Sequence, residues 1–172
     1  MKAYFAGGCF WCMEKPYHMI DGVISAESGY CGGTEENPAY ADVKAQRTSH
    51  RETVCVEFDE TVVSFSELLE VFLNSIDPFD EGGQFIDRGR SYTCAVYYTD
   101  EAQKTLAEQR IAEIERDFGK KVAVSVEPYL RFWRAEDYHQ DYARKNPEAY
   151  RKELEASGRL KTPIDLDNPG SL

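Results

Sequence analysis

Two cysteines near the amino terminus, Cys9 and Cys12, stand three positions apart and directly follow the glycine pair Gly7-Gly8. A Cys-x-x-Cys spacing lets two thiols meet and form a disulfide on one turn of backbone. The glycines leave the backbone free to bend sharply just before Cys9. A helix that begins here would face the first thiol with its free N–H groups and favour the thiolate. The pattern therefore indicates a redox-active or nucleophilic thiol pair.

The residues around the pair leave several chemistries open. Half of a zinc site needs two more ligands, and the other candidates are scattered without a second paired spacing: His18, His50, His139, Cys31, Cys55 and Cys94. We therefore expect no metal and no cofactor. A thioredoxin-like dithiol fits the spacing better, although the intervening Phe10 and Trp11 are bulky. These aromatic side chains would either form a small apolar pocket or pack in the core.

Composition limits the class of protein. The 172 residues suffice for one domain with a core, and 42% hydrophobic with 30% charged residues is typical of a soluble globular protein. The net charge of -11 argues against nucleic acid or an anionic membrane as the main partner. No apolar stretch approaches the length of a membrane span. Five cysteines without a regular framework fit a reducing cytosol, so we expect a cytoplasmic protein.

Hydrophobic periodicity predicts alternating strands and helices. We expect strands at 2–6, 23–30, 53–58, 94–98 and 122–127, and helices at 10–20, 66–76, 101–118 and from 135 onward. This alternation predicts an α/β fold, a two-layer sandwich of helices against a mixed sheet with a ferredoxin-like core. The helical signal fades after Pro147, so we expect a single catalytic domain over 1–150 and an irregular C-terminal extension over 151–172.

The strand at 53–58 gives Glu52 a special position. Glu52 shares a face with Val54, Val56 and Phe58, whereas Cys55 lies on the other face. A carboxyl group on the apolar face would be partly desolvated, which favours its protonated form. A frayed strand end with an exposed Glu52 explains the pattern equally well.

Two further stretches carry polar residues that could act in a site. The loop at 77–91 contains Asp87, and loops of this length in a compact domain often carry function. His139 stands among acidic neighbours and could be a base, although a lone histidine is more often a structural hydrogen-bonding residue.

A series of short motifs resembles the A-type peptide methionine sulfoxide reductases. The first is Gly8-Cys9-Phe10-Trp11 with Glu14. Further matches follow in order: Gly22-Val23, Gly29-Tyr30, Gly32-Gly33, Asn37-Pro38-x-Tyr40, His50-x-Glu52, Asp77-Pro78, Asp87-x-Gly89, Tyr92 and Tyr138-His139-Gln140-x-Tyr142. The resemblance extends from the first predicted strand to about Pro147.

The resemblance implies reduction of the S epimer of methionine sulfoxide, free or in proteins, and repair of oxidised proteins. Cys9, as thiolate, would attack the sulfoxide sulfur and become a sulfenic acid. The sulfoxide oxygen leaves poorly as an anion, so Glu52, kept neutral by its surroundings, would protonate it as the general acid.

The resemblance also implies how the substrate is held. Tyr40 and Tyr92 would hydrogen-bond the sulfoxide oxygen as it gains charge. Phe10 and Trp11 would hold the methyl group of the substrate, and Asp87 would help to order the site and its water.

Recycling needs a second thiol. Many relatives carry recycling cysteines in a glycine-rich C-terminal tail, but no cysteine follows Cys94 here. Cys12 is the best resolving cysteine because it is close to Cys9, and Cys31 and Cys55 are its rivals. Thioredoxin or a similar dithiol would then reduce the disulfide, and we expect the enzyme to be a monomer. A general thiol–disulfide oxidoreductase and a metal-binding module are the competing interpretations.

Overall fold

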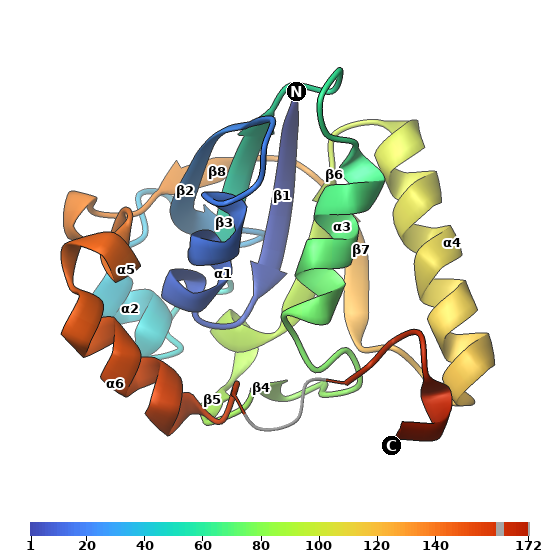
Figure 1. The fold of residues 1–172 in the computed structure, drawn as a ribbon. Coiled ribbons are helices and arrows are strands. Elements are labelled where there is room, and N and C mark those ends of the chain that lie inside the picture. Colours follow the sequence, from blue (N-terminus) through green and yellow to red (C-terminus); the bar gives the residue numbers. More distant parts are fainter. Residues whose placement is uncertain (161–163, 172) are drawn as a thin grey trace.

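A six-stranded sheet runs through the computed structural model, which describes residues 1–160 and 164–171 (Figure 1). From edge to edge its strands are β7 (Val124–Pro128), β6 (Cys94–Tyr98), β1 (Lys2–Gly7), β3 (Arg51–Phe58), β2 (Val23–Cys31) and β8 (Phe132–Arg134). Neighbouring strands are antiparallel except β6 and β7, which are parallel. The predicted mixed sheet is therefore confirmed.

Three helices, α1 (Phe10–Tyr17), α3 (Phe65–Asn74) and α4 (Glu101–Phe118), lie on one side of this sheet (Figure 1). The main core forms between the two layers and includes Phe5, Phe72 and Val96. In chain order β1, α1, β2, β3, α3 and β6 reproduce the alternation that the sequence predicted, and these four strands are neighbours in the sheet. The two-layer α/β architecture is confirmed.

The opposite side of the sheet carries a smaller apolar cluster. Because side chains alternate along a strand, the residues next to core positions point to this second face. The cluster consists of Tyr4, Ala6, Cys31, Cys55, Ala95 and Tyr97, with Tyr129 and Phe132 packed against it. The rings of Tyr4 and Tyr129 stack with their centroids 4.2 Å apart.

Shorter elements gather around the end of β1 that leads into α1 (Figure 1). They are α2 (Tyr40–Lys44), the hairpin of β4 (Gly83–Gln84) and β5 (Asp87–Arg88), the 3-10 turns Arg90–Tyr92 and Asp137–His139, α5 (Tyr142–Lys145) and α6 (Pro147–Ser157). A further 3-10 turn, Pro169–Ser171, closes the described chain. Among the described residues, no helix combines the length and the apolar character needed to cross a membrane.

Two predicted helices have different ends in the structure. α3 begins one residue earlier than predicted, and Ser64 caps its start. The Ser64 hydroxyl accepts from the Glu67 N–H while the Glu67 carboxylate accepts from the Ser64 N–H, which is a complete capping box. α1 ends at Tyr17, soon after its internal Pro16, because proline removes a hydrogen-bond donor from the helix.

The C-terminal part of the chain differs most from its prediction. Helix α6 begins at Pro147 and runs to Ser157, so the expected loss of helix after Pro147 is wrong. Proline is favoured at the first position of a helix, where its missing N–H has no partner to lose. The predicted boundary at residue 150 falls inside α6, and residues 151–157 are helical rather than irregular. The helix expected from 135 onward is interrupted: the structure has a 3-10 turn at Asp137–His139 and the short helix α5 before α6 begins.

Candidate active site

Cys9 lies in the tight turn between β1 and α1. It is the N-cap residue of α1, and its carbonyl accepts from the N–H groups of Cys12 and Met13 at 3.1 and 3.2 Å. The preceding Gly8 has a φ of 85°, and a Cβ atom there would lie 2.7 Å from Nη2 of Arg159. Only glycine fits this turn without strain. The glycine pair therefore fixes a partly exposed thiol at the start of a helix.

Cys9 and Cys12 form an interacting thiol pair, and both are reduced. The hydrogen bond between the two thiols raises the pKa of Cys9, as does burial, and the same hydrogen bond lowers the pKa of Cys12. The expectation that the helix end lowers the pKa of Cys9 is therefore wrong for the reduced pair. The pair loses its first proton more readily than its second, and the remaining proton is shared between the sulfurs. Transfer of this proton from Cys9 to Cys12 leaves the negative charge on Cys9, which is the more exposed of the two cysteines.

Glu52 lies on β3 with its side chain in the core, 1% exposed, so the alternative of an exposed strand end is wrong. Its Oε1 accepts from the N–H of Phe10 at 3.1 Å, while its buried Oε2 has no partner among the described residues. Burial raises the pKa of Glu52 to about 8, more than the Phe10 hydrogen bond lowers it. At neutral pH the carboxyl group is therefore mostly protonated and can donate a proton.

Tyr40 and Tyr92 contribute hydroxyl groups from α2 and the Arg90–Tyr92 turn. Burial raises the pKa of both, and the nearby charges of Glu52 and Cys9 raise it further. No residue of the described chain hydrogen-bonds either hydroxyl group. Both remain neutral donors at physiological pH, close to the thiol and the carboxyl group.

Aromatic rings surround the side of the site near α1. The Trp11 ring stacks on Tyr142 at 3.9 Å between centroids, and its Nε1 donates to Nδ1 of His139 at 3.0 Å. Phe10 lies 5.0 Å from the His139 ring and 6.1 Å from that of Tyr40, again between centroids. Burial lowers the pKa of His139, and its Nδ1 accepts a hydrogen bond, so it orients Trp11 as a neutral ring. His139 thus has the structural part that the sequence favoured.

Asp87 is brought near the thiol pair by the β4–β5 hairpin. Burial raises the pKa of this carboxyl group. Its negative charge in turn helps to raise the pKa of Glu52 and of Cys9. The hairpin therefore strengthens the preference of Glu52 for its protonated form.

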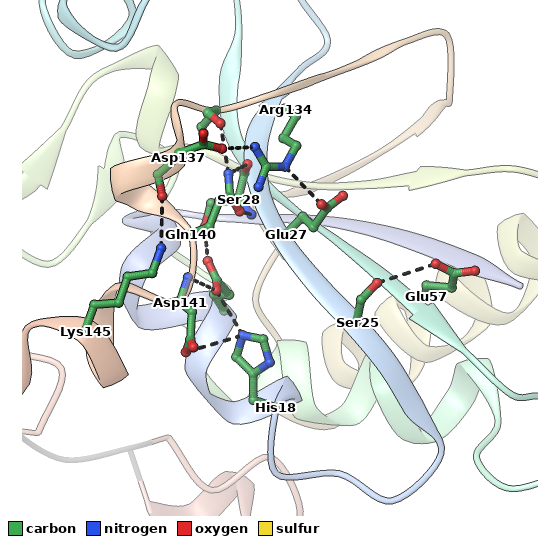
Figure 2. Close-up of polar contacts among 12 residues, drawn as sticks. His18, Ser25, Glu27, Ser28, Glu57, Arg134, Asp137, Gln140, Asp141 and Lys145 are labelled. Carbon is green, nitrogen blue, oxygen red and sulfur yellow. Dashed lines mark hydrogen bonds and ion pairs between the residues drawn. The ribbon is translucent and has the colours of Figure 1, made fainter.

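A buried polar network holds α1 against β2 and the segment before α5 (Figure 2). Glu14 accepts from the Ser28 hydroxyl, from the Asp141 N–H at 2.5 Å and from His18 at 2.9 Å. Gln140 bonds both main-chain groups of Ser28, at 2.8 and 2.9 Å. Within the described residues, the group of possible metal ligands that lie close enough together is Glu14, His18 and Asp141, away from the thiol pair. Its atoms already bond one another, so the network is a scaffold.

The remaining cysteines lie elsewhere in the fold. Cys31 and Cys55 belong to the cluster on the opposite face of the sheet. Burial raises the pKa of Cys31 to about 12 and that of Cys55 to about 11. Cys94 packs in the main core, and burial raises its pKa to about 12. Cys12 is the cysteine whose thiol interacts with Cys9 in the reduced protein.

Sequence reasoning missed two residues that approach the thiol pair from the C-terminal region. Tyr150, on α6, is buried, and burial and the nearby thiols of Cys12 and Cys9 raise the pKa of its hydroxyl group. Just beyond α6, Arg159 reaches the Gly7 carbonyl at 2.7 Å and the Ser75 carbonyl at 2.8 Å. No local sequence pattern predicts either contact, because both join residues that are far apart in the chain.

Comparison with known proteins decides the family. The family model described as peptide methionine sulfoxide reductase matches residues 1–164. This chain belongs to that family. The reduced form of Mxr1 from Saccharomyces cerevisiae is similar in structure, with a TM-score of 0.81, 29% identity and 86% of both chains covered. Methionine sulfoxide reductase A of Corynebacterium diphtheriae has a TM-score of 0.77 and 29% identity, covering 85% of this chain and 74% of that one.

Sequence relatives are closer still. The peptide methionine sulfoxide reductase MsrA 2 of Staphylococcus aureus is 45% identical over 159 residues, covering 91% of this chain and 90% of the relative. MsrA of Bacillus licheniformis is 45% identical, covering 91% and 88%. The protein is thus an A-type methionine sulfoxide reductase, an oxidoreductase that uses thiols to reduce oxidised methionine and so repairs oxidised proteins.

Proposed function

We propose that the enzyme reduces the S epimer of methionine sulfoxide with Cys9 as nucleophile and Glu52 as general acid. One observation carries the assignment of the acid. The carboxyl group of Glu52 is buried, with a pKa of about 8, and its Oε2 has no partner among the described residues. A buried polar atom without a partner is costly, so such an atom at a reactive thiol is best explained by a bond to substrate.

The first step transfers one oxygen atom. The Cys9 thiolate attacks the sulfoxide sulfur, and Glu52 gives its proton to the sulfoxide oxygen. The oxygen passes to Cys9, so the products are methionine, a Cys9 sulfenic acid and the Glu52 carboxylate. The substrate sulfur gains two electrons, and the Cys9 sulfur loses two.

The substrate is held by groups that surround Cys9. Phe10 and Trp11 are positioned by contacts with His139 and provide an apolar surface for the methyl group. Tyr40 and Tyr92 are neutral donors for the sulfoxide oxygen, where charge develops during the reaction. Asp87 supports the protonated state of Glu52 and orders water in the site.

Recycling follows through Cys12. Its thiol displaces hydroxide from the Cys9 sulfenic acid, which forms a disulfide and one water molecule. Cys31 and Cys55 are separated from Cys9 by the sheet, which favours Cys12. Thioredoxin or a similar dithiol then reduces the disulfide, and Mxr1 of Saccharomyces cerevisiae has been solved in complex with Trx2. We further propose that the enzyme acts as a monomer in the cytoplasm.

The test is incubation with each epimer of methionine sulfoxide and excess dithiothreitol, with methionine followed by chromatography. We expect loss of the S epimer alone, and no methionine from Cys9→Ser even in a single turnover. Reduction of insulin without loss of sulfoxide would instead make the protein a general thiol–disulfide oxidoreductase. Activity in Cys9→Ser would remove Cys9 as the nucleophile.

A further inference from the structure

Arg159 is half-buried and places a positive charge beside the turn that carries the thiol pair. Its Nη2 donates to the Gly7 carbonyl at 2.7 Å, and its Nη1 donates to the Ser75 carbonyl at 2.8 Å and lies 3.7 Å from the Met13 sulfur. A Cβ atom on Gly8 would come within 2.7 Å of Nη2. The guanidinium group therefore touches residues on both sides of the Cys9–Cys12 pair.

This charge has no matching carboxylate. Among the described residues, no Asp or Glu lies within 4.0 Å of Arg159, and its buried Nε has no hydrogen-bond partner. Buried charges are normally paired, because leaving water is costly for an ion. A cation that carbonyl groups hold in place beside thiols is therefore suited to a thiolate that forms only during the reaction.

Cys12 is the thiol that this charge favours. The hydrogen bond with Cys9 is the largest influence that lowers the pKa of Cys12, burial raises this pKa, and the positive charge of Arg159 lowers it further. Arg159 is not among the main influences on Cys9. Tyr150, which is 6% exposed, lies close enough to the same sulfur that charge on Cys12 raises the pKa of the tyrosine hydroxyl group. The titratable or charged groups that influence Cys12 or are influenced by it are Cys9, Glu52, Asp87, Tyr150, Glu153 and Arg159. Of these, only Arg159 carries a positive charge.

We propose that Arg159 is a positioning residue for the resolving step, in which its charge stabilises the Cys12 thiolate that closes the disulfide. The inference rests on the proposed function, since it needs the Cys9 sulfenic acid. Cys12 loses its proton, its sulfur bonds to the Cys9 sulfur, and the S–O bond of the sulfenic acid breaks. The hydroxide that leaves and the proton from Cys12 make one water, so no outside oxidant is required.

The test separates formation of the sulfenic acid from its resolution. One equivalent of substrate is added to reduced enzyme, methionine is measured, and dimedone traps any remaining Cys9 sulfenic acid over time and pH. For Arg159→Met we expect methionine to form, disulfide closure at pH 7 to slow about tenfold, and its pH midpoint to rise by about one unit. Raising the pH should restore the closure rate, which a purely structural defect would not allow.

Two variants serve as controls. Arg151→Met removes an exposed arginine of α6 that pairs with Glu155 at 3.0 Å, and it should close the disulfide as the wild type does. Arg159→Lys keeps the charge and should close within about threefold of the wild type. A lysine variant as slow as the methionine variant would contradict a role for the charge.

A second measurement follows Cys12 directly and uses a different substitution of Arg159. In the Cys9→Ser protein, thiolate absorbance should show Cys12 ionising at a lower pH when Arg159 is present than when it is replaced by Arg159→Gln. Ionisation of Cys12 at the same pH in both proteins overturns the proposal. Closure of Arg159→Met with the wild-type rate and pH profile does so as well, while the proposed function stands. Failure of the wild type to form methionine would instead reject the proposed function.

Discussion

The N–H of Phe10 donates a hydrogen bond to Oε1 of Glu52 at 3.1 Å, across a separation of 42 residues in the chain. The residue that follows Cys9, the proposed nucleophile, thereby fixes the carboxyl group that we propose as the acid. Because Oε1 is occupied, Oε2 is the oxygen free to carry the proton to a substrate. Nucleophile and acid are positioned by one turn of backbone and cannot shift independently.

Replacing Glu52 with Gln should slow methionine formation in a single turnover by about 10²- to 10⁴-fold, because the amide cannot transfer a proton to the sulfoxide oxygen. Rapid-quench measurement with the S epimer tests this. Glu57→Gln, on the same strand but with a partly exposed side chain, is the matched control and should retain the wild-type rate. An unchanged rate in Glu52→Gln would show that the proton comes from elsewhere.

The rate of the first turnover should stop rising with pH at about pH 8. Below this pH the rate rises because more Cys9 is ionised, and above it the protonated fraction of Glu52, whose pKa is raised to about 8, declines and offsets this gain. A single-turnover profile from pH 6 to 10 gives the pH at which the rise ends. A rate that keeps rising to pH 10 would be incompatible with Glu52 as the acid.

The free energy of unfolding should also depend on the protonation of Glu52. Between about pH 4.5 and 8 the folded protein keeps the Glu52 proton and the unfolded chain loses it, so this group makes the folded state less stable as the pH rises. The loss is complete above about pH 8 and is of order 5 kcal/mol at most. Denaturant unfolding of the wild type and of Glu52→Gln at pH 5 and pH 8 measures it. We expect the mutant to gain stability relative to the wild type at the higher pH, and a constant difference would refute the assigned pKa.

Removing either hydroxyl group that faces the substrate should weaken the transition state. Tyr40→Phe and Tyr92→Phe should each lower kcat/KM about 10- to 100-fold, because each removes one donor to the developing oxyanion. Tyr98→Phe, on β6, is the control and should be neutral. If both site variants kept full activity, the oxygen would have to be held by other groups.

Replacing Cys12 with Ser should separate chemistry from recycling. The variant should form one methionine per enzyme and then stop when thioredoxin is the reductant, because no partner thiol lies beside Cys9. Cys31→Ser is the matched control and should recycle normally, as its thiol lies on the other face of the sheet. Peptide mapping after one turnover should find Cys9 joined to Cys12. A disulfide from Cys9 to Cys31 or Cys55 would require the sheet to open.

Local patterns predicted the parts of this structure that depend on near neighbours in the chain. The alternation at 53–58 correctly placed Glu52 and Cys55 on opposite faces of the strand, but it left open whether Glu52 is buried. The helix at 101–118 has the predicted ends, since Asp100 caps its start and Gly119, with a φ of 64°, ends it.

Contacts between distant segments could not be predicted in this way. A proline such as Pro147 can follow the end of one helix or be the first residue of another, so the sequence did not predict α6. The residues next to Arg159 in the sequence do not predict that its side chain reaches Gly7, 152 residues earlier. The pKa of Glu52 also depends on burial by the whole fold, whereas the strand pattern gives only the direction in which the side chain points.

The six-stranded sheet also separates the Cys9–Cys12 pair from the thiols of Cys31 and Cys55. The proposed chemistry at Cys9 takes place on one side, while Cys31 and Cys55 lie on the other, within a buried apolar cluster. Incorrect cross-links between Cys9 and these residues would require the strands to come apart. The enzyme can therefore keep spare cysteines through many catalytic cycles without scrambling its own disulfides.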